Sequence, residues 1–267
     1  MTARSTKILN QDEQVAAAVE LNSAEWVRRL ASVPWVQLHD EPDVLWCFAG
    51  DTWPMNSVAC ARFRPTTARP RIREILAHHW EHKVACNWIV GPMSEPGDLG
   101  RHLRDNGFSC RVHCAGMACD LARLNGEAPI PDGATVKQVE ELPSLVPLTT
   151  ERRRRRHEGR KLIAKAQPRS IAYFSASVDG QAVGETALLL DGGGVAGIYD
   201  VEVRQEFRRR GIGSALIHAA LQHARKHGLK IAVLGATGLG ARIYQNAGFR
   251  EVCKISFWKY GKIRQLR

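Results

Sequence analysis

The sequence lacks paired C-x-x-C motifs and long apolar runs. Its seven cysteines are odd in number, so neither a zinc site of ordinary spacing nor a complete set of disulfides is expected. We interpret them as small buried hydrophobic residues in a reducing compartment. No apolar run approaches the roughly 18 residues that a membrane-spanning helix needs, and the polar N-terminus MTARSTKILNQDEQ has no signal-peptide core. We therefore expect a soluble, cytoplasmic protein that holds no metal ion and binds no membrane.

Acidic residues are scarce in the second half of the chain. The 267 residues include 38 Lys and Arg against 27 Asp and Glu, which gives a formal net charge of +11. Residues 1–125 contain 14 basic and 14 acidic side chains, whereas residues 126–267 contain 24 and 13. A one-sided positive field attracts nucleic acid, an anionic membrane or a nucleotide cofactor, and charge alone does not choose among them.

The chain is long enough for two domains, and its apolar content of 44% is typical of globular proteins. The stretch LNGEAPIPDGA, residues 124–134, interrupts the apolar patterning on both sides with prolines, glycines and acidic residues. We therefore predict one domain over residues 1–125, a linker over 126–133 and a second domain over 134–267.

The second half alternates between predicted strands and predicted helices. Strands are expected at residues 134–140, 170–178, 182–190, 196–203, 230–236 and 249–260, and helices at 142–166, 213–228 and 239–248. The helix at 213–228 has the clearest pattern, because its apolar side chains recur at helical spacing and Gly228 is a natural C-cap. This alternation indicates an α/β or mixed α+β layer fold.

The first half repeats this order in a weaker form. Strands are expected at residues 43–50, 56–63, 87–92 and 108–121, and helices at 69–83 and 96–107. When Gly107 is set over Gly248, a phenylalanine follows both glycines, and the segments WIVGP and AVLGA fall near each other. We interpret this parallel as an internal duplication, in which each half is one copy of the same fold.

The segment VEVRQEFRRRGIGSAL, residues 201–216, predicts a strand, a short basic glycine loop and a helix. Helix N-termini present unpaired backbone amides and the positive end of the helix dipole, so they bind phosphate well. Gly211 and Gly213 remove side chains that would block close approach, and the three arginines before them add positive charge. A ligand with a diphosphate group is the natural interpretation, and a plain strand-to-helix turn with solvated arginines is the alternative.

This loop resembles the acetyl-CoA loop of the GNAT N-acetyltransferase superfamily, which has the pattern (Gln/Arg)-x-x-Gly-x-(Gly/Ala). Here it is RRRGIG at residues 208–213, and Tyr244 follows in ARIYQNAGF, like the family's helix-borne tyrosine before Gly-Phe and a last strand. The resemblance covers about residues 134–260. It implies two GNAT-like domains, each with a central mixed, mostly antiparallel twisted sheet flanked by helices, as in tandem members of the superfamily.

The first copy lacks the residues that the resemblance requires. Its aligned loop, TARPRI, has no glycine pair, and Leu103 stands where Tyr244 would be. We therefore expect this half to be a degenerate copy that does not bind acetyl-CoA in the usual way. Its expected role is to cover the catalytic copy, to shape the acceptor pocket, or both. Its histidines, gathered mainly on one predicted helix, are interpreted as packing or surface residues.

By the same resemblance, acetyl-CoA is the cosubstrate. The strand at 196–203 would run beside the pantetheine arm and separate from the next strand, and a backbone N–H there would polarise the thioester carbonyl. The pyrophosphate would lie on the loop amides, and a threonine before the tyrosine helix would cap that helix or touch the cofactor. The implied cofactor-binding residues are Val201, Val203, Arg208, Arg209, Arg210, Gly211, Ile212, Gly213, Ser214 and Thr237.

A base is needed because an amine acceptor must lose a proton before it attacks a thioester, with a pKa of about 8 for an α-amino group and about 10.4 for lysine. Asp200 and Glu202 are the candidate bases, acting directly or through water. They lie two apart on one strand and so share a face, while alternation places Tyr199, Val201 and Val203 on the other face. Each carboxylate has the alternative of being merely solvated or salt-bridged.

Tyr244 is implied to return a proton to the leaving thiolate, and the alternative is an amphipathic core tyrosine. These features predict an acetyl-CoA-dependent N-acetyltransferase that acts on the primary amine of a small molecule by direct attack in a ternary complex. One alternative acceptor is a macromolecular amine, in a protein or an aminoacyl-tRNA, held by the basic second half. Another possibility is a non-catalytic acyl-CoA-binding protein. Nucleic acid binding is not favoured, and the protein is expected to be a monomer or a homodimer.

Five consecutive arginines lie in ERRRRRHEGRK, residues 151–161, in the region that resembles the acceptor-side helices of the family. The first turns of this helix contain no apolar residue, which indicates a solvent-facing start with ion pairs between Glu151 and Arg155 and between Arg154 and Glu158. The alternative is that the arginines line the acceptor entrance and favour an anionic substrate, which includes RNA.

Overall fold

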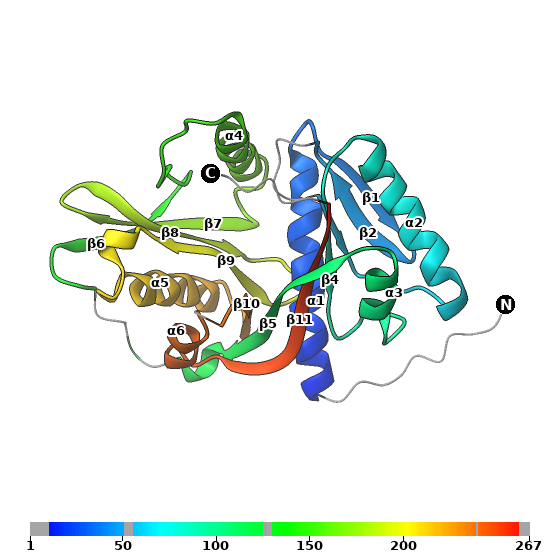
Figure 1. Cartoon of the computed structure of the whole chain (residues 1–267). Helices are drawn as coiled ribbons and strands as arrows, with labels where there is room; N and C mark the ends of the chain where they lie inside the picture. The colour runs from blue at the N-terminus through cyan, green and yellow to red at the C-terminus, as the bar shows by residue number, and fades with distance from the viewer. Residues whose placement is uncertain (1–10, 51–55, 125, 127–129, 239, 262–267) are drawn as a thin grey trace.

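The computed structural model describes residues 11–50, 56–124, 126, 130–238 and 240–261 (Figure 1). The first half contains helices α1 (Gln11–Arg29), α2 (Pro65–Glu81) and α3 (Leu99–Asp105), and strands β1 (Gln37–Glu41), β2 (Val44–Phe48), β3 (Ser57–Ala59), β4 (Cys86–Val90) and β5 (Ser109–Asp120). The second half contains helices α4 (Glu151–Ala166), α5 (Ile212–Lys226) and α6 (Ala241–Asn246), and strands β6 (Ala134–Val139), β7 (Ile171–Val178), β8 (Gln181–Leu189), β9 (Ala196–Val203), β10 (Ile231–Ala236) and β11 (Arg250–Tyr260).

The strands of both halves form one continuous 11-stranded sheet. Its order is β1-β2-β3-β4-β11-β5-β10-β9-β8-β7-β6. The pairs β3–β4 and β9–β10 are parallel, and the other neighbouring pairs are antiparallel. The predicted mixed, mostly antiparallel sheet flanked by helices is therefore confirmed.

The last strand of each half completes the sheet of the other half. β5 pairs with β10, with Met117 opposite Leu234, and β11 pairs with β4, with Trp258 opposite Trp88. β5 and β11 also pair with each other and form the junction between the halves (Figure 1). Backbone hydrogen bonds thus join the two halves into one sheet. The predicted linker follows β5 in the chain, and the division into two domains stays a prediction.

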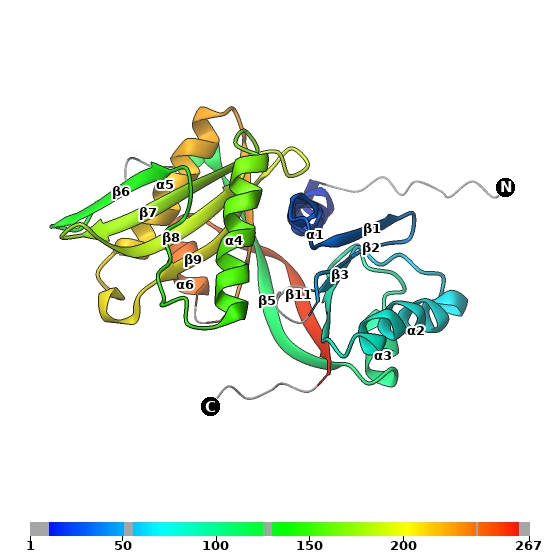
Figure 2. The same cartoon turned by 90° about the horizontal axis from the view of Figure 1, so that it is seen from above.

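Helices cover both faces of the sheet. In the second half α5 packs on one face, where Leu216 lies in one core cluster with Leu188. α4 packs on the opposite face with α1, where Val27 and Ile163 share a cluster with Leu189. Figure 2, seen from above, shows α4 lying over β8 and β9. The sheet therefore has a face covered by α5 and α6 and a face covered by α1 and α4, which we call the α1/α4 face.

Helix α1 fixes the first half against the second. The side chain of Asn22 is buried and donates to the carbonyls of Gly192 at 3.1 Å and Val195 at 3.2 Å, just before β9. Glu20, which is also buried, accepts from the Met93 amide at 2.6 Å and the Ser94 hydroxyl at 3.0 Å, both after β4. Since buried polar groups are costly without partners, these contacts hold α1 in one position over the junction.

The described residues include no group of three or more His, Cys, Asp or Glu arranged to hold a metal ion. No helix in this described part is long and apolar enough to cross a bilayer. The seven cysteines are free thiols and are buried or half-buried. Burial raises the pKa of the Cys47 and Cys119 thiols to about 11, which fits their interpretation as small core residues.

Candidate functional site

A β-bulge bends β9 at Asp200, where the backbone φ is 51°. The extra residue of the bulge reverses the alternation of side chains along the strand. Tyr199 therefore points to the α1/α4 face, where its ring stacks on Trp26 with centroids 4.3 Å apart. Val201 and Val203 instead pack against the α5 core. The prediction that Tyr199 shares a face with these two valines is wrong, because it assumed a regular strand.

β9 and β10 separate shortly after they begin to pair. Their only register pairs in the described residues are Ala196 with Ala232 and Gly197 with Val233. Beyond these pairs, the edge of β9 is open on the β10 side, next to Val201 and Val203. The Val203 carbonyl accepts the Arg208 Nε–H at 2.9 Å. The separation of the two strands that the resemblance implies is therefore present.

Helix α5 begins at the glycine loop with unpaired amides. Gly211 is the N-cap residue, with φ 85° and ψ −9°, in the left-handed region that favours glycine. The first intrahelical bond runs from the Ala215 amide to the Gly211 carbonyl at 3.0 Å. The amides of Ile212, Gly213 and Ser214 therefore have no acceptor within the helix, and no side chain of the described residues caps this end. Such an N-terminus suits a phosphate group.

Gly213 also has a packing role that the sequence did not indicate. A Cβ at Gly213 would lie 3.0 Å from Ile243 Cδ1, so the missing side chain lets α5 approach α6 closely. A Cβ at Gly211 would lie 3.2 Å from Pro131 Cγ. The close approach of backbone at Gly213 is thus required by the protein itself, and not only by a ligand.

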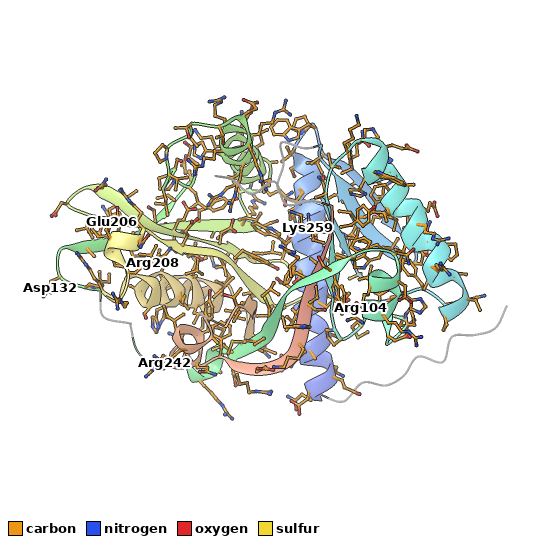
Figure 3. The ribbon with its side chains drawn as sticks, viewed as in Figure 1. Arg104, Asp132, Glu206, Arg208, Arg242 and Lys259 are labelled. Carbon is orange, nitrogen blue, oxygen red and sulfur yellow. The ribbon has the colours of Figure 1, made fainter. Side chains whose placement is uncertain are left out.

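Basic side chains surround the start of α5. They line an open hollow together with two residues of the turn before them, and Figure 3 marks Arg208 and Glu206 there. The guanidinium of Arg210 lies over the Phe207 ring at 5.2 Å, which orients it. The residues of this hollow are Gln205, Glu206, Arg208, Arg209 and Arg210.

Tyr244 lies on α6, half-buried against the α5 core, with the Phe249 ring edge-on to it at 6.0 Å. Burial raises the pKa of Tyr244, so its hydroxyl holds its proton at neutral pH. The hydroxyl has no hydrogen bond to any of the described residues. This is the protonation state that a proton donor needs.

Thr237 does not cap α6 with its side chain. Its carbonyl, rather than its hydroxyl, accepts the amides of Gly240 at 2.8 Å and Ala241 at 3.1 Å. Gly240 is the N-cap residue, so the prediction of a threonine side-chain cap is wrong. The Thr237 side chain is exposed, and its contact with the cofactor stays a prediction.

The carboxylates of Asp200 and Glu202 share the α1/α4 face. The bulge does not separate them, since Asp200 lies 3.8 Å from Arg156 of α4 and Glu202 pairs in register with Glu185 of β8. The strand therefore brings both candidate bases beneath α4, next to the open edge of β9.

Glu185 is a third carboxylate at this place, and the sequence reasoning missed it. It is 1% exposed, and its Oε1 accepts from Arg160 at 2.6 Å. Its Oε2 is buried and has no hydrogen-bond partner among the described residues. Burial raises the pKa of Glu185, and Arg160 partly offsets that rise. A single charged residue inside the apolar strand AVGETALLL was the available signal, because carboxylates are almost never buried without a specific partner.

The arginine run of α4 is not entirely solvent-facing. The predicted ion pair of Glu151 with Arg155 is confirmed at 3.4 Å. The predicted pair of Arg154 with Glu158 is wrong, because Arg154 binds Glu151 at 3.2 Å instead. The guanidinium of Arg155 lies 5.0 Å over the Trp35 ring of the first half. One side of this helix therefore faces the sheet and the other half of the molecule.

In the first half, another segment of the chain occupies the edge beside β3 that corresponds to the open edge of β9. β3 and β4 are parallel and pair at only two register positions, as β9 and β10 do. However, the segment after β4 returns to the open edge, where the Phe63 amide donates to the Glu95 carbonyl at 3.1 Å and the Glu95 amide to the Ala61 carbonyl at 2.8 Å. α2 begins at Pro65 without a glycine loop, and Leu103 is fully buried.

Comparison with known proteins gives a family match in the second half. Residues 137–249 match the model of the acetyltransferase (GNAT) family. An uncharacterized N-acetyltransferase of Methanocaldococcus jannaschii is 35% identical over 95 residues, which are 32% of this chain. The matched region spans 42% of the length of that relative.

Solved GNAT structures share the fold over nearly the whole chain. A GCN5-related N-acetyltransferase from Kribbella flavida superposes with a TM-score of 0.65 at 18% identity, covering 94% of this chain and 98% of its own. A tandem GNAT protein from the clavulanic acid biosynthesis pathway has a TM-score of 0.61 at 16% identity and covers 94% and 95%. The likeness in fold thus extends over both halves of the chain.

Proposed function

We propose that this chain, whose residues 137–249 match the model of the acetyltransferase (GNAT) family, transfers the acetyl group of acetyl-CoA to the primary amine of a small molecule. The transfer is by direct attack in a ternary complex. The observation that carries the proposal is that free backbone groups of two elements lie at one place. They are the unpaired amides at the start of α5 and the edge of β9 that β10 leaves free.

The residues around these edges fit acetyl-CoA. The amides from Arg209 to Ser214 would hold the pyrophosphate, with the loop arginines adding charge and the Ser214 hydroxyl a further donor. The backbone of β9 near Val201 and Val203 would bond the pantetheine arm and orient the thioester. When bound, acetyl-CoA supplies an acetyl group that is activated as a thioester.

The carboxylates beneath α4 are proposed to receive the acceptor amine. The ammonium form must lose its proton before attack, and Asp200 and Glu202 are the accessible bases, acting directly or through water. Glu185 is too deeply buried for direct contact, so we assign it a positioning role: its ion pair with Arg160 fixes α4 above the two bases.

Tyr244 is proposed as the proton donor to the thiolate that leaves. A tyrosine with its ordinary pKa of about 10 is protonated at neutral pH, and burial raises the pKa of Tyr244 further. Its hydroxyl has no hydrogen-bond partner among the described residues, so it is available. Its removal is expected to slow the release of CoA while the cofactor still binds.

The first half is proposed to have a structural role, as a degenerate copy that covers the catalytic one. The return of the Glu95 segment to the edge beside β3 supports this, because the chain occupies the edge that a cofactor would need. We also propose a cytoplasmic location and a monomeric or homodimeric state.

Release of free CoA thiol from acetyl-CoA, measured across a library of primary amines, tests the proposal. At least one class of small amines is expected to raise thiol release well above the rate without acceptor. Mass spectrometry must find an acetyl group, 42 Da, on the amine. Acetyl-CoA binding without transfer to any amine would instead favour a non-catalytic acyl-CoA-binding protein, and acetylation of a protein or tRNA alone would favour a macromolecular acceptor.

A further inference from the structure

Among the described residues, these three basic side chains have no acidic partner: Arg152 in the first turn of α4, Arg111 on β5 and Lys259 on β11. No ion pair or side-chain hydrogen bond joins any of them to the residues that the structure describes. Each comes from a different element, so local sequence did not bring them together. The strand exchange brings Arg111 and Lys259 together, because it sets β5 and β11 side by side at the junction.

Lys259 lies on the α1/α4 face of the sheet. Along β11, Ile255 and Phe257 belong to the cluster that α1 covers, and alternation places Lys259 on the same side. Figure 3 marks Lys259 at the end of β11. Burial, followed by repulsion from Arg152 and Arg111, lowers the pKa of Lys259. Lys259 pairs in register with Ser109, and Arg111 follows two residues later on β5. An anion beside these cations would relieve their repulsion.

Arg152 is the outer member of a row along α4. Arg152, Arg156 and Arg160 are spaced four apart and so lie along one side of the helix. Arg160 binds Glu185 at 2.6 Å and Arg156 lies 3.8 Å from Asp200. At 1.5 Å per residue, Arg152 is displaced from Arg160 by about 12 Å along the axis. Along this side of α4, Arg160 and Arg156 thus lie close to carboxylates, whereas Arg152, two turns from Arg160, has no carboxylate partner among the described residues.

The inner end of this row has the opposite charge balance. There the three carboxylates of Glu185, Asp200 and Glu202 exceed the two guanidiniums of Arg156 and Arg160 by one charge. Glu185 also presents a buried oxygen without a donor. This excess of one negative charge favours an ammonium group at the inner end, while the outer end favours an anion.

We infer that the acceptor carries an oxyanion, a carboxylate or a phosphate, in addition to its amine. Arg152, Lys259 and Arg111 bind this oxyanion, and the carboxylates beneath α4 receive the amine. The inference rests on the proposed acetyl transfer and adds its substrate class: small amines that are also anions. The same cations repel polyamines and basic peptides, which carry no compensating negative charge.

Matched acceptor pairs test this inference. Ethanolamine is compared with O-phosphoethanolamine, and butylamine with 4-aminobutyrate, by kcat/KM for thiol release and by calorimetric binding to the protein saturated with CoA. The wild type is expected to favour the anionic member of a pair by about tenfold or more, as two or more charge-assisted hydrogen bonds require. The pair that shows the larger preference distinguishes phosphate from carboxylate.

Lys259→Ala and Arg152→Ala should each remove most of that preference, which is the ratio of kcat/KM between the two members of a pair. Lys254→Ala is the matched control, because Lys254 is on the same strand, is 74% exposed and is paired with Glu251 at 2.6 Å. Acetyl transfer with no preference for the member of each pair that carries an oxyanion would refute the oxyanion site and leave the proposed function standing. Equal binding of the two members within both pairs would refute the site without any need for turnover. Salt-dependent binding of tRNA, with no preference among small amines, would also contradict it.

Discussion

Replacing Arg160 by leucine is expected to lower the free energy of unfolding, and the loss should grow with pH. The guanidinium of Arg160 is the only described hydrogen-bond donor to Glu185, a carboxylate that is 1% exposed. Leucine carries no positive charge to compensate the negative charge of Glu185. The variant therefore leaves an uncompensated carboxylate inside the sheet.

The magnitude follows from the burial of the two partners. Removing one partner of a fully buried pair costs about 3–5 kcal/mol. Because the Arg160 side chain is itself 16% exposed, water screens part of this pair, and we expect about 2–3 kcal/mol at neutral pH. At about 2–4 °C per kcal/mol for a chain of this size, the melting temperature should fall by about 5–10 °C.

The sign of the pH dependence is set by the pKa of Glu185. Burial already raises that pKa and Arg160 lowers it, so loss of the arginine raises it further. A carboxyl with a higher pKa in the native state than in the unfolded state makes the native protein bind more protons between the two pKa values. The free energy of unfolding then falls as the pH rises through that interval. The loss of unfolding free energy in Arg160→Leu, relative to the wild type, should be smallest near pH 5. This is close to the pKa of about 4.3 of a glutamate in the unfolded chain.

Urea unfolding at about pH 5 and about pH 7.5 measures both effects. Arg154→Leu is the control, since Arg154 is 55% exposed and lies on the same helix. Its effect should stay within about 0.5 kcal/mol at both pH values. The double variant Arg160→Leu with Glu185→Leu should recover much of the lost stability, because it removes the unpaired charge. An equal loss at both pH values, or a double variant less stable than the single one, would refute the reasoning.

Three further predictions concern the cofactor site and α1. Tyr244→Phe should lower kcat for thiol release about a hundredfold without changing the calorimetric Kd of acetyl-CoA; an unchanged kcat would contradict its role as proton donor. Gly211→Ala, at φ 85°, should lose about 1–2 kcal/mol of stability and weaken acetyl-CoA binding, whereas Gly228→Ala, at φ 81° on the other end of α5, should lose stability alone. Asn22→Leu leaves two buried backbone carbonyls unpaired and should lower the free energy of unfolding in urea by about 2–4 kcal/mol; a loss below about 0.5 kcal/mol would count against α1 as the tie between the halves.

Local features of the fold could be predicted from the sequence because the residues that cause them are adjacent. The strand at 196–203, the helix that follows the glycine loop and the terminal Gly228 all depend on side chains a few positions apart. Gly211 takes the positive φ that its place before α5 requires. Local propensity and local structure agree in this segment, which is why the prediction succeeded there.

The exchange of β5 and β11 could not be predicted in the same way. Both strands follow a Gly-Phe pair and have similar lengths and apolar patterns, so either one could complete either sheet. The choice is made by long-range pairing, such as Met117 with Leu234, and by α1, which was not among the predicted helices. Pairing between distant strands leaves no periodic trace in a single sequence.

The details of the candidate site depended on one irregular residue and one buried charge. The bulge at Asp200 moves Tyr199 to the opposite face from Val201, and an alternation pattern assumes that no residue is extra. Glu185 was missed because residues 182–190 were predicted only as a strand, with no role given to its one charged residue. Its partner, Arg160, lies 25 positions away, so the pair became visible only in three dimensions.

Binding of acetyl-CoA tests the central claim most directly. The account predicts that acetyl-CoA raises the melting temperature of the purified protein, with about 2.7 kcal/mol of stabilisation at a concentration one hundred times its Kd. Adenine nucleotides without the pantetheine arm should give a much smaller rise, since they cannot use the open edge of β9. No response to acetyl-CoA or to any other acyl-CoA would contradict the account.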